Sequence, residues 1–147
     1  MLERCAGLAR SFQSTISKWV QDNERALEAV AKEAIQELAI EADKPRAKGG
    51  RMPVDTSFLR NSMAAARNSI PSGPSAPTDG FSATDHDMTP VTLVINQIKL
   101  GDRFVVGFTA NYAQFMENKY FFVRHAAQNW QQHVDKAVRK VKRAARL

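Results

Sequence analysis

The sequence predicts an α+β fold in which a long N-terminal helix and a C-terminal helix pack on a small antiparallel β-sheet that carries a long loop. Three observations predict it. Apolar residues recur at helical spacing in residues 10–43 and again in residues 121–145. Residues 91–108 are rich in β-branched side chains, whereas residues 70–90 are rich in Pro, Ser and Gly. A chain of 147 residues suits one domain with a core, so we expect a single domain over residues 1–147.

Residues 10–43 are expected to form one amphipathic helix. Apolar side chains recur every three or four residues from Phe12 to Leu38, which is typical of one buried helical face. Trp19 lies in this stripe, and we expect it in the core. A proline two residues after Asp43 indicates that the helix ends there.

A second, short helix is predicted over Ser57–Arg67. Either Asp55 or Thr56 could cap it, because short polar side chains accept hydrogen bonds from the free N–H groups of a first turn. Phe58 and Leu59 lie on its apolar face and are expected in the core.

The middle of the chain predicts a loop followed by a hairpin. Residues 70–90 contain four prolines and no apolar periodicity, so we expect an extended loop. Phe81 has nothing local to bury against and is expected to contact a partner. Residues 91–108, with a turn at Gly101-Asp102, predict a β-hairpin. A lone hairpin is marginally stable, so helices must cover it.

The last helix is expected over residues 121–145, after a short helix that carries Tyr112 and Phe115. Phe122 and Trp130 lie in the apolar stripe of the last helix. We expect all four of these aromatic side chains in the core, because large aromatic side chains contribute most of the buried apolar area of a small domain.

The net charge is +6, and its distribution is uneven. Acidic residues gather on the first helix, while basic residues gather in residues 44–67 and 136–146. Separate acidic and basic elements suit complementary surfaces of neighbouring subunits. A basic surface also suits nucleic acid, and an acidic helical face can simply be solvated. The candidate interface residues are Glu24, Glu28, Glu37, Arg51, Arg60, Phe81, Lys136, Arg139, Lys140 and Arg143.

The sequence carries no catalytic signature. It has no Gly-x-Ser-x-Gly, no His-Glu-x-x-His and no dinucleotide-binding fingerprint, so we expect neither an enzyme nor a bound cofactor. Cys5 is the only cysteine, which excludes an intrachain disulfide. His86 has no further ligands at metal-binding spacing, so no metal site is expected. No signal peptide or membrane-spanning run is apparent, which favours synthesis in the cytoplasm and no membrane partner.

Three motif segments follow one another along the chain. They are Thr56–Ser62 (TSFLRNS), Tyr112–Glu117 (YAQFME) and Phe122–Ala126 (FVRHA). Together they resemble the tail-completion proteins, also called tail-terminator or head-tail joining proteins, of long-tailed bacteriophages. That family typically shows Thr-Gly-x-Leu-Arg-x-Ser, then a strand ending in Tyr-Ala-x-Tyr/Phe-x-Glu, then Phe-x-Arg-x-Ala opening the last helix. This sequence departs from the pattern at Ser57, where a glycine is usual and where the serine suggests a slightly different turn.

The resemblance implies a structural virion protein of the phage neck, assembled in the host cytoplasm. Such a subunit forms a ring with copies of itself, commonly a hexamer. The ring completes the tail and joins it to the head-closure or connector protein, next to the tail tube protein. Genomic DNA would pass through the lumen without sequence-specific binding. The alternatives are a head-closure protein or another minor tail protein, and a basic nucleic-acid-binding protein.

Overall fold

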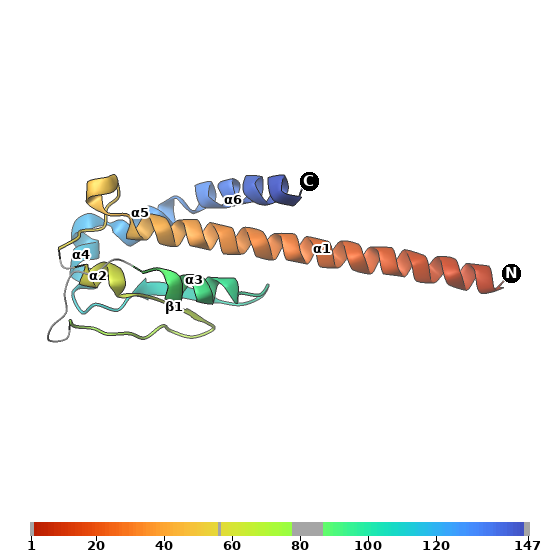
Figure 1. Ribbon diagram of the computed structural model, residues 1–147, viewed down its shortest axis with the longest axis horizontal. Coiled ribbons are helices and arrows are strands. Elements are labelled where there is room, and N and C mark those ends of the chain that lie inside the picture. Colours follow the sequence, from red (N-terminus) through yellow and green to blue (C-terminus); the bar gives the residue numbers. More distant parts are fainter. Residues whose placement is uncertain (1, 56, 78–86, 146–147) are drawn as a thin grey trace.

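The computed structural model describes residues 2–55, 57–77 and 87–145 (Figure 1). Phe81, the expected partner contact, lies outside the described residues. The fold is α+β, as predicted. In chain order the elements are α1 (Leu2–Asp43), a 3₁₀ turn η1 (Arg46–Lys48), α2 (Phe58–Asn61), β1 (Met63–Arg67), α3 (Thr89–Asn96), β2 (Phe104–Phe108), α4 (Ala113–Tyr120), α5 (Phe122–Gln128) and α6 (Trp130–Ala145).

Helix α1 organises the molecule. It spans 42 residues, or about 63 Å at 1.5 Å per residue, and it begins well before the predicted residue 10. The end at Asp43 is as predicted. In Figure 1, α5 and α6 lie along one side of the C-terminal half of α1, and α3 with the sheet lies along another. The N-terminal half of α1 projects beyond all of them (Figure 1).

The first core cluster lies between α1, α3, the sheet and α5. Several of its members are alanines, which let the helices approach closely. Partly buried side chains such as Leu38 and Phe104 complete it. The buried members are Ala39, Ala42, Met63, Val91, Ile95, Ile98 and Ala126.

The second core cluster joins segments that are far apart in the sequence. Phe58 and Leu59 are each 4% exposed, and Phe122 is 1% exposed, so their predicted core positions are confirmed. Phe122 packs its ring edge to face on Phe108, with ring centroids 5.1 Å apart. Tyr112 is half-buried against the same cluster, 6.3 Å from the ring of Phe58.

The predicted hairpin over residues 91–108 is wrong, because its first half is helix α3. Strand β2 pairs instead with β1, in an antiparallel register that places Met63 opposite Phe108. Val91, Ile95 and Ile98 are all buried at steps of four and three residues, which is helical spacing. A proline in the first turn favours the same start, since its missing N–H has no partner there anyway.

The predicted helix over Ser57–Arg67 is also wrong in its second half. Only Phe58–Asn61 is helical, and residues 63–67 form β1. The three alanines of β1 favour a helix by intrinsic propensity. Pairing with β2 and packing of Ala65 on the first core cluster override that preference. Ser57 occupies the cap position of α2, where the sequence suggested Asp55 or Thr56.

Three predicted core aromatics are exposed, and their prediction is wrong. Trp19 is 64% exposed because it lies on the projecting half of α1. Phe115 is 68% exposed, while the next residue of α4, Met116, packs against the second core cluster. The predicted continuous last helix is broken at Asn129. Trp130 opens α6 beyond this break and is 41% exposed.

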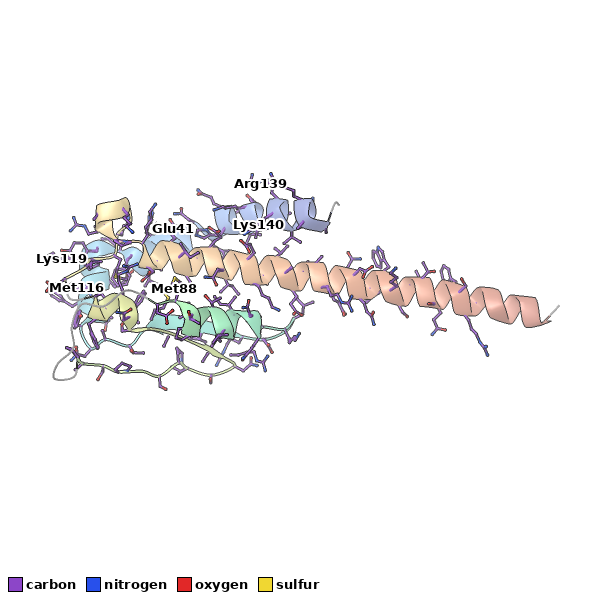
Figure 2. The ribbon with its side chains drawn as sticks, in the orientation of Figure 1. Glu41, Met88, Met116, Lys119, Arg139 and Lys140 are labelled. Atoms are coloured by element: carbon purple, nitrogen blue, oxygen red, sulfur yellow. The ribbon has the colours of Figure 1, made fainter. Side chains whose placement is uncertain are left out.

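The described part of the 70–90 loop is attached to the end of β2. Thr109 Oγ1 donates a hydrogen bond to the carbonyl of Pro74 at 2.8 Å, and the Asn111 N–H donates to the carbonyl of Ser75 at 2.7 Å. The loop is shorter than predicted, because residues 89–90 already belong to α3. Met88, just before that helix, packs against the first core cluster (Figure 2).

Candidate assembly surfaces

A row of ion pairs connects α1 to α6. Glu33 pairs with Lys140, and Glu37 pairs with Lys136 at 2.9 Å. The two glutamates are one turn apart on α1, and the two lysines are one turn apart on α6, so the rows match. The hydrogen bond from Lys140 to Glu33 raises the pKa of that lysine. The sequence predicted that these acidic and basic residues would contact neighbouring subunits. In the structure, these four residues form ion pairs within one chain instead.

Glu41 continues this row at the junction of α5 and α6. Its carboxylate lies 2.6 Å from His133 Nε2 and 3.3 Å from His125 Nε2, and it accepts a 2.7 Å hydrogen bond from the Asn129 side chain. His133 is 8% exposed, so the contact is largely shielded from water. The cluster holds the break between the two helices against α1. Among the described residues, no group of three or more His, Cys, Asp or Glu side chains could hold a metal ion.

The outer side of α6 carries basic residues that the α1 ion pairs do not use. Arg139 and Arg143 are exposed, and among the described residues neither forms an ion pair. Figure 2 shows Lys140 on the side of α6 near α1 and Arg139 on the opposite side. Of the four basic residues of α6 predicted at an interface, these two arginines remain available to a partner.

Arg60 has a structural partner. Its guanidinium donates to both carboxylate oxygens of Asp43, at 2.9 and 3.4 Å, and Asp43 is 3% exposed. The pair fastens α2 to the last turn of α1. The predicted interface role of Arg60 is not supported by this position, because the side chain is mostly buried in its own subunit.

The other charged candidates lie apart from one another. Glu28 forms ion pairs with Lys32 at 2.9 Å and with Lys99 at 3.3 Å. The hydrogen bond from Lys32 is the main cause that lowers the pKa of Glu28. Glu24 is exposed on the projecting half of α1. Arg51 is exposed and, with Arg124, lines a shallow basic groove of about 280 Å³.

Glu117 links α4 to α5. Its two carboxylate oxygens accept hydrogen bonds from the backbone N–H groups of Val123 and Arg124, each at 2.9 Å. These N–H groups begin a helix and would otherwise lack a partner, so the carboxylate acts as a cap. Between them, Phe121 adopts a left-handed conformation with φ 56° and turns the chain. This role was not evident from the sequence, because Glu117 lies six and seven residues before its two partners.

Ser57 adopts a left-handed backbone conformation, with φ 65° and ψ 4°. Any residue other than glycine is strained in this conformation, because its Cβ lies too close to the following carbonyl oxygen, at a cost of roughly 1–2 kcal/mol. Ser57→Gly should therefore leave stability unchanged or raise the free energy of unfolding by up to about 1 kcal/mol, since glycine also makes the unfolded chain more flexible. Urea denaturation would measure this. A loss of more than about 1 kcal/mol would contradict the expected strain at Ser57.

Residues of α2 and α4 line an apolar pocket of about 660 Å³. These two helices lie at the end of the molecule opposite the N-terminus (Figure 1). We call this pocket the α2–α4 pocket. Sequence reasoning missed it because its lining comes from three separate segments. Its apolar lining includes Pro53, Val54, Phe58, Tyr112, Met116 and Tyr120.

The projecting half of α1 is the second exposed apolar surface. All described side chains of residues 9–25, which we call the α1 arm, are exposed to solvent. Phe12, Ile16, Trp19 and Val20 lie on this arm and are 70%, 45%, 64% and 41% exposed. The sequence predicted this apolar stripe correctly, but placed it against the subunit's own core.

Comparisons with known proteins do not assign this chain to a family. A scan against protein-family models finds no family that matches, and searches among curated proteins and solved structures find no match. Within the described residues, no helix is both long enough and apolar enough to cross a membrane. A function must therefore be argued from the motif segments and the surfaces described above.

Proposed function

We propose that this chain is a structural subunit of the neck of a long-tailed phage, a tail-completion protein that forms a ring. One observation carries the proposal: the three motif segments of the resemblance meet in a single core cluster. Phe58 and Leu59 come from the first segment, Tyr112 from the second and Phe122 from the third. Residues shared with the family for packing would be expected to meet in this way.

Two further features support the resemblance. Glu117, the last residue of the second motif segment, caps the helix that the third segment opens. Ser57, where the family usually has glycine, adopts a backbone conformation that favours glycine. Both features give a physical reason for residues that the motifs specify. In the first motif segment, the glycine position is where the backbone turns in a left-handed conformation. In the second segment, the glutamate is the residue that caps the helix opened by the third segment.

The surfaces suit a ring subunit. The α2–α4 pocket and the exposed basic side of α6 are different surfaces of the molecule. Different surfaces allow head-to-tail contacts, which generate a closed ring when the rotation closes. The proposed partners are copies of the chain, the head-closure or connector protein above the ring, and the tail tube protein below it.

The exposed basic side of α6 is consistent with two positions in the ring. Arg139 and Arg143 could face DNA in the lumen, where they would contact phosphates without reading sequence. They could equally face an acidic surface of a neighbouring protein. A free-standing nucleic-acid-binding protein is the weaker alternative, because Lys136 and Lys140 already pair with α1.

The test is deletion of the gene from the phage that encodes this chain. The deletion should give filled heads and separate tails, and supplying the protein from a plasmid should restore infectious particles. Electron microscopy of the restored particles, carrying a tagged chain, should place the label in a closed ring at the head-proximal end of the tail. Normal infectivity without the gene would contradict the proposal.

Fractionation separates the alternatives. Heads and tails from an infection blocked before joining are purified apart and probed for this chain. A tail-completion protein is expected on the tails. Its presence on filled heads would assign it to the head-closure tier instead. Its absence from both fractions, with salt-sensitive binding to free DNA, would favour the nucleic-acid-binding alternative.

A further inference from the structure

The α1 arm presents a one-sided apolar surface to solvent. Phe12, Ile16 and Trp19 follow one another at steps of four and three residues, so they share one face of the helix. Val20 borders this face, and Leu27, 59% exposed, extends it toward the body of the molecule. A stripe of this size, on a stretch of helix whose described side chains are all exposed, marks an interaction surface.

The surface continues into a groove on the body. Ala31 is one turn after Leu27, and it lines an apolar groove of about 420 Å³ together with Leu38, Leu100 and Trp130. Trp130 and Leu100 are 41% and 47% exposed there. The arm and the groove thus form one extended apolar strip along α1, which a second helix of similar length could cover.

The area of the strip suits a second copy of this chain. Five large side chains on the strip, from Phe12 to Leu27, are about half exposed on average. With roughly 100 Å² available from each, the strip offers about 500 Å² per copy. Two copies that covered each other would bury on the order of 1,000 Å², which is about the minimum for a specific interface and is typical of a weak one. The groove beside Trp130 adds to that area.

We propose that the α1 arm is a self-association surface, on which two copies of this chain pack through their exposed apolar stripes. The inference does not depend on the phage proposal, because it concerns the purified chain alone. Its failure would leave the neck assignment untouched, and failure of the neck assignment would leave the dimer untouched.

The experiment measures the mass of the full-length chain by analytical ultracentrifugation over a range of micromolar concentrations. The wild-type chain should sediment as a dimer in equilibrium with monomer. Trp19→Glu places a charge at the centre of the stripe and should weaken association by at least about tenfold. Because Trp19 is exposed in the single subunit, the variant should fold normally, which far-ultraviolet circular dichroism would check.

Ser14→Glu is the matched control. It adds the same charge to the same exposed stretch of α1, but two residues from Phe12 and from Ile16, about 200° around the helix from each. Its association should equal that of the wild-type chain. A monomeric wild-type chain at tens of micromolar, or equal weakening by Ser14→Glu and Trp19→Glu, would overturn the proposal. A larger closed assembly that Trp19→Glu leaves intact would also overturn it.

Discussion

Replacing Phe122 with alanine should lower the free energy of unfolding by about 3–5 kcal/mol. The side chain is 1% exposed, and its ring packs edge to face on Phe108. It is also the point where the segments of Phe58 and Tyr112 meet the start of α5. Removing the ring would leave a cavity that three separate segments would have to fill. Urea denaturation followed by circular dichroism would measure the change.

Phe115→Ala is the control for this substitution. It removes the same side chain from α4, seven residues earlier in the chain, at a position that is 68% exposed. Its effect should be within about 0.5 kcal/mol of zero, as for most surface substitutions. If the two variants lost equal stability, the assignment of Phe122 to the core and of Phe115 to the surface would be wrong.

Replacing Arg60 with alanine should cost about 3 kcal/mol, because the change leaves the buried carboxylate of Asp43 without its main charged partner. The Asp43 side chain is only 4% exposed, so water cannot replace the guanidinium. Urea denaturation followed by circular dichroism would measure this loss as well. Lys99→Ala removes a lysine that is 67% exposed and pairs with Glu28, and it should cost at most about 1 kcal/mol.

A double variant separates the ion pair from other contacts of Arg60. Asp43→Asn combined with Arg60→Ala removes both charges at once. The combined loss should be smaller than the sum of the two single losses, because no uncompensated charge remains buried. Additive losses would mean that Asp43 and Arg60 stabilise the fold independently of each other.

Several elements could be predicted because their signals are local. The end of α1 at Asp43 follows from a proline two residues later, and the amphipathic pattern of α1 and the last helix follows from apolar spacing. Phe58, Leu59 and Phe122 were correctly expected in the core. Each of these features depends on neighbouring residues, which a sequence displays directly.

The errors share a different cause. Val91, Ile95 and Ile98 fit helical spacing, but their β-branched side chains favoured a strand. The alanines of β1 favoured a helix, although β2 needed them as its only partner strand among the described residues. In both segments the local preference is weak, and packing against other elements overrides it. Those packing partners lie tens of residues away in the sequence.

The sequence by itself determined that this chain has an apolar stripe on α1, an acidic series beside it and a basic last helix. Only the tertiary structure decided which partners these features have. Part of the acidic series is paired with α6 inside the subunit, and Trp19 is left in solvent on the α1 arm. The physical reason is length: α1 is longer than the elements that pack on it, so the same helical pattern is buried at one end and exposed at the other.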